Sequence, residues 1–270
     1  MPIPRDIFAS LSLVIPVYNG SRVLRGTLAD AHTYLTALDI PFEVIVVDDG
    51  STDDSAAIAA GFGSSLPGPT LRLIRSTPNR GKGHAVRIGM LAAEHDWVLF
   101  MDADHSTSIR HLDRFAPVAA GLIGAPATSR PPSSRPGIVV IASRRLSTAR
   151  IVRRQHPIRQ ALGRTFPYLV RLLAVSDLAD TQCGFKLFTR TAAQSVFSRL
   201  RTEGFAFDVE ALLLARKLGF RIAEVPVDWD NPIESTLKVY RHTVPMLWDV
   251  LKTKWRLRGG RATAPHMPSP

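Results

Sequence analysis

The feature that most constrains the fold of this chain is a series of short apolar runs that each end in polar or glycine-rich residues. Four of them lie in the first part of the chain, and a helical pattern follows each. They are Leu11–Val17 before Tyr18-Asn19-Gly20, Phe42–Val47 before Asp48-Asp49-Gly50, Leu71–Arg75 before Asn79–Gly83, and the run in Val98–Asp104 that ends at Asp102. Strands that alternate with helices predict an α/β fold with a mostly parallel sheet flanked by helices.

The strand ends are where binding chemistry is expected, because ligands of open parallel sheets sit beyond the carboxyl ends of the strands. Asp102 and Asp104 are two residues apart, and side chains at that spacing on an extended backbone point the same way. Carboxylate oxygens suit Mg²⁺ or Mn²⁺, which keep open positions for phosphate oxygens. The pair predicts a metal site, although two ordinary acids at a strand end have the same pattern.

The turn Gly81-Lys82-Gly83 is a second candidate for phosphate binding. It is not a Walker A loop, because Ser76 replaces the required glycine and Gly83 replaces the Ser or Thr. It is not GxGxxG either, since Val86 takes the place of the last glycine. These departures exclude a P-loop NTPase and a dinucleotide-binding dehydrogenase. Backbone N–H groups and Lys82 at a helix start still suit an anion, and a plain helix-capping loop is the alternative.

Six motifs in order carry a family resemblance. They are IPVYNG (Ile15–Gly20), VVDDGSTD (Val46–Asp53), NRGKGHAVRIG (Asn79–Gly89), DADHST (Asp102–Thr107), DTQCGFKLF (Asp180–Phe188) and GFAFDVEALLLARKLGFRIAEVPV (Gly204–Val227). The first four resemble the family 2 glycosyltransferases of the GT-A (Rossmann-like) fold. The last two resemble the dolichyl- or polyprenyl-phosphate β-glucosyltransferase branch, to which the polyprenol-phosphate mannosyl synthases are closely related. The resemblance runs from Leu11 to Val250.

The resemblance implies an inverting, metal-dependent hexosyltransferase that moves glucose from UDP-glucose onto a polyprenyl or dolichyl phosphate. It implies roles for eight residues on the donor side. Pro16 and Tyr18 cover the base, and Asp48 or Asp49 accepts a hydrogen bond from the base or ribose. Gly81 and Lys82 lie at the diphosphate, and Asp102 and Asp104 hold Mg²⁺ or Mn²⁺. Three alternatives stay open: a GDP-mannose-dependent mannosyltransferase, a transferase to a hydroxyl acceptor, and a catalytically silent protein that binds sugar nucleotides or membranes.

The excess positive charge of the chain is concentrated in one segment. Eight arginines and no acidic residue lie between Arg144 and Arg171. Planar guanidinium groups favour bidentate recognition of phosphate, so a lipid phosphate, a headgroup surface or nucleic acid would suit them, and a solvated face is the alternative. Nucleic acid is disfavoured, because aromatic and basic residues do not interleave and no binding module is recognisable. The resemblance implies that Arg144 and Arg159 bind the acceptor phosphate.

The acceptor decides whether the reaction needs a general base. A phosphate monoester has a second pKa of about 6 and is mostly dianionic at neutral pH, so it needs positioning and charge screening instead. Asp180 matches a polar position near the acceptor in relatives, and either a base or an orienting partner of Arg144 or Arg159 fits it. Gln182 and Lys186 are expected to line the cleft.

The bulk properties set the domain organisation. At 270 residues, 45% hydrophobic, the chain is long enough for one large α/β core. The single Cys183 excludes an internal disulfide and fits a reducing compartment. The sequence has no run of 18 uncharged apolar residues, so it predicts no transmembrane helix. We expect an N-terminal extension (1–10), one glycosyltransferase domain (11–236), an amphipathic basic helix (237–258) and a disordered tail (259–270).

The C-terminal helix predicts a membrane partner. Its apolar residues at helical spacing include Trp248, Leu251 and Trp255, and basic residues crowd its end. This pattern is typical of an interfacial helix on an anionic membrane surface, and a helix packed on its own domain is the alternative. Proline is tolerated in a first turn, so Pro245 is expected to begin the helix. The alternative is that it lies inside the helix and makes a kink. Together with the resemblance, this places the protein peripherally at the cytoplasmic face of a membrane.

Overall fold

The computed structural model describes residues 7–66, 68, 70–124, 137–151, 177–230 and 239–258. Its centre is a seven-stranded sheet in the order β3-β2-β1-β4-β7-β5-β8. These strands are β3 (Leu71–Arg75), β2 (Phe42–Asp48), β1 (Leu11–Val17), β4 (Trp97–Met101), β7 (Phe185–Thr189), β5 (Ile138–Ser143) and β8 (Arg221–Pro226). Only β7 runs antiparallel to its neighbours, β4 and β5. The predicted mostly parallel sheet is therefore confirmed.

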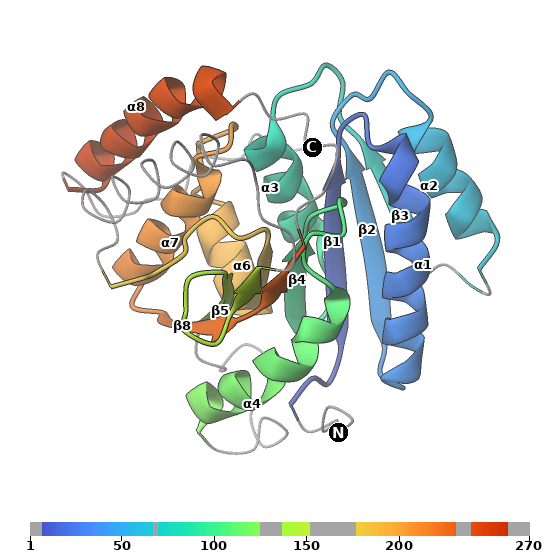
Figure 1. Ribbon diagram of the computed structural model, residues 1–270, viewed down its shortest axis with the longest axis horizontal. Helices are drawn as coiled ribbons and strands as arrows, with labels where there is room; N and C mark the ends of the chain where they lie inside the picture. The colour runs from blue at the N-terminus through green and yellow to red at the C-terminus, as the bar shows by residue number, and fades with distance from the viewer. Residues whose placement is uncertain are drawn as a thin grey trace.

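Helices cover both faces of the sheet (Figure 1). One face is covered by α1 (Ser21–Ala37), α2 (Ser55–Ser64), α4 (Leu112–Ile123) and the short 3₁₀ helix η1 (Ile109–His111). The other face is covered by α3 (Lys82–Ala92), α6 (Arg190–Phe197), α7 (Phe207–Lys217) and α8 (Val239–Arg258). A separate two-stranded pair joins β6 (Arg150–Ile151) to β9 (Asp228–Trp229).

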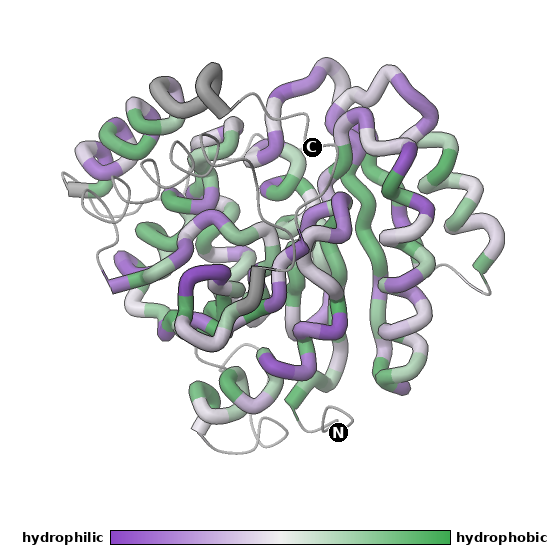
Figure 2. Tube along the Cα trace, viewed as in Figure 1, coloured by the Kyte–Doolittle hydropathy of each residue, from purple (hydrophilic) through white to green (hydrophobic). Residues whose placement is uncertain are grey.

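The apolar runs form strands because both of their faces are buried. All seven residues of β1 are enclosed. Leu13 and Ile15 face the core under α1, whereas Val14 faces the core under α3, as the two-residue period of a strand requires. A strand covered on both faces reads as a continuous hydrophobic run rather than an alternating one. In Figure 2 the central strands are accordingly hydrophobic, and the loops above their carboxyl ends are hydrophilic.

Helix α3 lies close against the sheet because Gly89 has no side chain. A Cβ atom there would overlap the side chain of Val14 on β1. The close approach fixes the start of α3, and with it Lys82, beside the carboxyl end of β4. On the opposite side of the sheet, Phe8 precedes β1 and stacks edge-on against Trp97, with ring centroids 5.2 Å apart. The residues just before β1 therefore contribute to the core.

Helix α8 begins at Val239 and contains Pro245 in its interior, so the prediction that Pro245 begins the helix is wrong. An interior proline removes one backbone hydrogen bond, and packing of the helix outweighs that cost here. Val250 and Thr253 are buried on the side of α8 that packs against α7. Trp248, Leu251 and Trp255 are exposed on the opposite side of the helix. In the part of the chain that the structure describes, no helix is long and apolar enough to cross a membrane.

Candidate active site

The polar residues after β1, β2 and β4 meet at one edge of the sheet. Val17 at the end of β1 is paired with Asp48 at the end of β2, and its carbonyl accepts the N–H of Asp49 at 2.9 Å. Asp102 follows β4 directly, and its N–H donates to the carbonyl of Gly184, which precedes β7, at 2.9 Å. The carboxyl ends of the parallel strands thus form one polar edge beside the start of α3, as the sequence pattern predicts.

Asp48 is fully buried and closes its own turn. One carboxylate oxygen accepts the N–H of Ser51 at 3.0 Å, and the other accepts from Arg75 Nε at 3.2 Å. Arg75 ends β3, so this carboxylate joins two strand ends. The side chain has a structural role whether or not it also contacts a base or ribose.

Asp49 is also buried and holds the turn before α3. Its carboxylate accepts the N–H of Gly81 at 2.7 Å and the N–H of Arg80 at 3.1 Å. Gly81 has φ of +113°, and a Cβ there would run into the carbonyl of Glu203. The N–H of Gly81 is therefore engaged by Asp49 rather than directed at an anion in this structure. A carboxylate has about four lone-pair sites, so Asp49 keeps capacity for a ligand N–H.

Pro16 and Tyr18 have different surroundings. Pro16 is buried within β1. Tyr18 is 53% exposed just beyond the end of the strand, where its ring has free surface for stacking. Of the two residues expected at the base, Tyr18 is the one that can cover a planar ligand without rearrangement.

Lys82 and Asp102 form the central ion pair of this edge. Lys82 Nζ lies 2.7 Å from Asp102 Oδ1 and 5.5 Å from the centre of the Phe100 ring. Oδ1 is buried, and the ammonium of Lys82 is its partner among the described residues. Burial raises the pKa of Asp102 because it disfavours the charged carboxylate, and a nearby cation offsets that cost. Burial also opposes the charge of Lys82, but Asp102 and then Asp208 raise the pKa of the ammonium.

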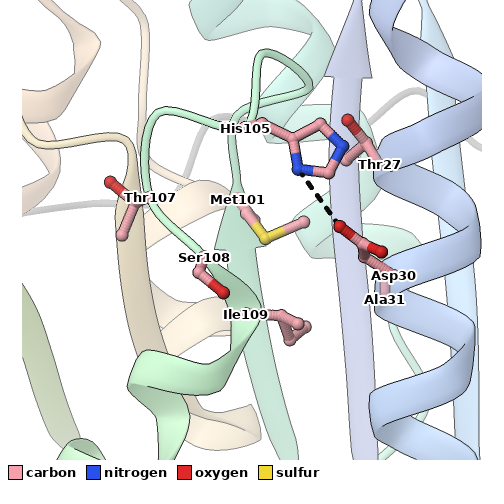
Figure 3. A pocket seen from close by; sticks show the side chains of 8 residues that line it. All are labelled: Thr27, Asp30, Ala31, Met101, His105, Thr107, Ser108 and Ile109. Atoms are coloured by element: carbon pink, nitrogen blue, oxygen red, sulfur yellow. Dashed lines mark ion pairs between the residues drawn. The ribbon is translucent and has the colours of Figure 1, made fainter. Parts of the chain in front are cut away.

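Asp104 lies in the loop that follows β4. Its Oδ1 accepts the N–H of Ser106 at 3.0 Å, which closes a tight turn. His105, between them, has φ of +58°, a conformation that is uncommon for residues other than glycine. His105 Nδ1 lies 3.5 Å from a carboxylate oxygen of Asp30 on α1, so its ring is directed toward that helix (Figure 3).

Arg144 and Asp180 form a second ion pair beyond the ends of β5 and β8, in which Asp180 is buried and Arg144 is partly exposed. Asp180 accepts Arg144 Nε at 2.7 Å and Nη2 at 3.0 Å, and the backbone N–H of Arg144 at 3.1 Å. Burial raises the pKa of Asp180, yet the Arg144 guanidinium outweighs it and lowers the value to about 2. Arg144 also lies over the ring of Trp229, 5.4 Å from its centre. Arg159 lies outside the described residues.

Comparison with known proteins identifies the family. Residues 12–120 match the sequence model described as "Glycosyl transferase family 2". A dolichyl-phosphate beta-glucosyltransferase of Drosophila melanogaster is 37% identical over 260 residues, which are 92% of this chain and 77% of that protein. The protein of the same name from Dictyostelium discoideum is 34% identical over 251 residues, 91% of this chain and 74% of its own. The chain belongs to the family 2 glycosyltransferases. The resemblance stated from the motifs is confirmed.

The solved structures agree with this fold. A glucosyl-3-phosphoglycerate synthase from Mycobacterium tuberculosis, crystallised with phosphoglyceric acid, superposes with a TM-score of 0.62 at 19% identity. The match covers 93% of this chain and 80% of that one. A crystal structure of the same enzyme with Mn²⁺, UDP-glucose and phosphoglyceric acid gives a TM-score of 0.62 at 18% identity. At these identities the likeness concerns the fold of the family 2 glycosyltransferase domain.

The carboxylates of this family 2 glycosyltransferase fit a hard divalent cation. Asp102 presents a buried oxygen that already holds the ammonium of Lys82, and Asp104 lies two residues further along the same loop. Among the described residues no three His, Cys, Asp or Glu side chains converge as a closed metal cage. Mg²⁺ is typically bound by one or two carboxylates together with substrate phosphates, and Asp102 with Asp104 supplies that number.

A buried pair beneath the site in this glycosyltransferase was missed by sequence reasoning. Lys186 on β7 is 1% exposed, donates to the carbonyl of Cys183 at 2.6 Å and is ion-paired with Asp208 at the start of α7. Its ammonium lies 5.7 Å from the centre of the Phe100 ring, whose centre Lys82 also approaches. Lys186 is thus enclosed in the core and does not line a cleft. Asp208 is its counter-ion.

Glu210 links the C-terminal helix of the glycosyltransferase to the start of α3. Its carboxylate accepts the N–H groups of Arg201 and Thr202 and is ion-paired with Arg256 on α8. The loop that contains Thr202 and Glu203 packs directly on Gly81 and Gly83. No sequence pattern predicts these contacts of Glu210, because only the fold brings the loop and α8 together.

Proposed function

We propose that the protein transfers glucose from UDP-glucose to a polyprenyl phosphate such as dolichyl phosphate, with Mg²⁺ or Mn²⁺ as the required ion. The dolichyl-phosphate beta-glucosyltransferases among its relatives support the acceptor. The solved relative with Mn²⁺ and UDP-glucose supports the donor and the ion.

The observation that carries the proposal is that one short segment, Asp180 to Gly184, contacts both charged pairs: Asp180 holds Arg144, and the Gly184 backbone lies against Asp102, the partner of Lys82. Burial opposes the charge of Arg144, but the Asp180 carboxylate raises the pKa of the guanidinium, which therefore stays charged. A diphosphate at Lys82 and a lipid phosphate at Arg144 would lie in one polar site, which suits transfer between two phosphate-bearing substrates.

The chain's own residues account for the chemistry that this transfer needs. A divalent ion at Asp102 and Asp104 would neutralise charge on the departing diphosphate. Lys82 adds a fixed positive charge on the same side. Arg144, held by two oxygens of Asp180, is oriented to fix a phosphate oxygen for attack on the anomeric carbon as the bond to UDP breaks. A dianionic phosphate carries no proton to remove, so Asp180, with a pKa near 2, acts by orienting Arg144.

We further propose that α8 attaches the protein peripherally to the cytoplasmic face of a membrane. Trp248 and Trp255 are 59% and 82% exposed, and Lys252 lies over the Trp248 ring at 5.5 Å from its centre. Exposed indoles beside basic residues suit the boundary between headgroups and acyl chains. A membrane-bound enzyme would meet its lipid acceptor without extracting the chain into water.

The experiment that tests the function is an incubation of the purified protein with dolichyl phosphate, Mn²⁺ and one sugar nucleotide at a time. We expect a glucosyl phospholipid from UDP-glucose, identified by mass spectrometry, and no product when the ion is chelated. A mannosyl lipid from GDP-mannose, or transfer only to a hydroxyl acceptor, would contradict the proposal. UDP-glucose binding without transfer to any acceptor would favour a catalytically silent protein.

A further inference from the structure

The loop that carries the metal carboxylates is attached to α1 through its alternate residues. Asp102 is ion-paired with Lys82 on the donor side, whereas Ala103 and His105 contact α1. The Thr27 hydroxyl donates to the carbonyl of Ala103 at 2.7 Å, and Thr27 is 1% exposed. Every second residue of the loop is therefore fixed by a helix on the opposite side of the sheet from Lys82.

His105 fits against the same side of α1. Its ring lies over Gly26, where an added Cβ would be only 3.3 Å from Nε2. Its Nδ1 faces Asp30, one helical turn further on. Figure 3 shows Thr27 and Asp30 projecting from α1 toward the loop, with His105 directed at Asp30. Gly26, Thr27 and Asp30 thus form one face of α1, which we call the α1 clamp.

Resting on the proposed function, we propose that Thr27 and Asp30 are positioning residues that hold Asp104 in register with Asp102 for the divalent ion. His105 has a left-handed backbone conformation that its surroundings must maintain. If the clamp is loosened, the loop can relax toward ordinary backbone angles and separate the two carboxylates. A small displacement of a ligand-bearing loop weakens binding of the ion without changing which residues bind it.

The test compares metal binding in three full-length variants that have no acceptor present. Thr27→Val keeps the shape of the side chain but removes the hydroxyl, and Thr27→Ser restores the hydroxyl. Tyr34→Phe is the matched control, because the Tyr34 hydroxyl anchors the same helix to Asp113 at 2.5 Å, far from the loop. The measurement is Mn²⁺ affinity at saturating UDP, by calorimetry or by the paramagnetic resonance of free Mn²⁺, together with the melting temperature.

We expect Thr27→Val to weaken Mn²⁺ binding about fivefold, the factor given by loss of one hydrogen bond of about 1 kcal/mol. Thr27→Ser should recover most of the affinity. Tyr34→Phe should lower the melting temperature and leave Mn²⁺ affinity unchanged. Equal affinity of Thr27→Val and the native protein, or equal weakening by Tyr34→Phe, would overturn the clamp.

Asp30→Ala gives an independent measurement that does not depend on a buried substitution. The Asp30 side chain is 73% exposed, so its removal leaves the fold intact. We expect a loss of Mn²⁺ affinity of about twofold, smaller than for Thr27→Val because the pair is solvent-exposed. Unchanged affinity in both Asp30→Ala and Thr27→Val would exclude a positioning role for this face. If the native protein itself bound no Mn²⁺ with UDP, the proposed function would fail, and the inference with it.

Discussion

At the scale of single residues, charged side chains at the site are held by identifiable partners. Asp48 and Asp49 brace turns, Asp180 is fixed on Arg144, and Asp102 faces Lys82. Asp104 differs, because its one described hydrogen bond is a local contact with the N–H of Ser106. Substitutions should therefore separate into those that disturb the fold and those that disturb only the chemistry.

Asp104→Ala should abolish transfer and leave the fold intact. Loss of a metal ligand removes several kcal/mol of charge stabilisation on the leaving group, so turnover should fall about a thousandfold. Asp54→Ala is the matched control, since Asp54 is an exposed acid whose side chain makes no capping hydrogen bond. Turnover and thermal melting are measured on both. Near-normal turnover of Asp104→Ala would exclude its metal role.

Asp180→Asn should retain part of the activity that Asp180→Ala loses. The Asn carbonyl oxygen still accepts a hydrogen bond from Arg144, whereas alanine leaves the partly buried guanidinium without this partner. The change should appear in acceptor KM and kcat, with UDP affinity nearly intact. Asn and Ala variants that were equally inactive and equally well folded would instead indicate a proton acceptor or a required negative charge.

Asp180 should also make the protein sensitive to acid. Its pKa in the folded protein is about 2, below the ordinary 3.8, so its contribution to stability is complete above pH 3.8. The contribution, about 2 kcal/mol, is lost as the pH falls from about 4 through about 2. About half of it is lost by pH 3, so chemical unfolding at pH 6 and pH 3 follows the change. Asp180→Asn should flatten this part of the stability profile, and an unchanged profile would refute the assignment.

At the scale of elements, the antiparallel strand β7 has the largest effect on the site. Its insertion between β4 and β5 brings Gly184 next to Asp102 and places Asp180 near the end of β5. The Gly184 backbone lies so close that a Cβ atom there would overlap the Asp102 carboxylate. The position of this carboxylate therefore depends on β7 as well as on β4.

Gly184→Ala should displace Asp102 and reduce transfer on the order of a hundredfold, the typical cost of misplacing a reactive group by about 1 Å. Gly61→Ala in α2 is the control, because nothing lies within 4 Å of the added methyl group. In a helix interior it should stabilise the protein by about 0.5–1 kcal/mol. Turnover and melting temperature distinguish the two. Full activity of Gly184→Ala would show that Asp102 has room to move.

The elements that the sequence predicted are those specified by local pattern. Strands β1 to β4 follow from apolar runs, and their ends correctly located Asp102 and Lys82 at one edge. Two contacts join residues far apart in the chain: the Lys186–Asp208 ion pair and the hydrogen bond from Thr27 to Ala103. Hydrophobic periodicity cannot predict such contacts. The start of α8 was misjudged because packing against α7 tolerates Pro245 inside a helix. These contacts are determined by strand pairing and tertiary packing, which a local sequence pattern does not contain.

At the scale of the whole molecule, α8 has two different sides. Val250 and Thr253 are part of the folded domain, and Arg256 is ion-paired with Glu210, so removal of the helix would uncover the core. The exposed side with Trp248, Leu251 and Trp255 is accessible to a membrane without any rearrangement. Both interpretations of this helix from the sequence, packing and membrane contact, are thus compatible with the structure.

Trp248→Ser combined with Trp255→Ser should weaken binding to anionic vesicles at least about tenfold. Each indole that leaves water contributes more than about 1 kcal/mol, and neither ring supports the core. Val23→Ser on α1 is the control, because Val23 is an exposed apolar residue on another surface. Co-sedimentation at low and high salt measures binding, and salt should weaken it by screening charges beyond about 8 Å. Equal binding by the native and double variants would exclude α8 as the membrane contact.

The exposed side of α8 has an optical consequence. The chain has four tryptophans, of which Trp97 is fully buried and Trp229 is partly covered beneath Arg144. The other two, Trp248 and Trp255, lie in water and belong to the helix expected at the lipid. The red-shifted part of the protein's intrinsic fluorescence therefore comes from α8. This emission should shift toward the blue when the helix enters the boundary between headgroups and acyl chains. The native protein therefore needs no added fluorophore to report membrane binding.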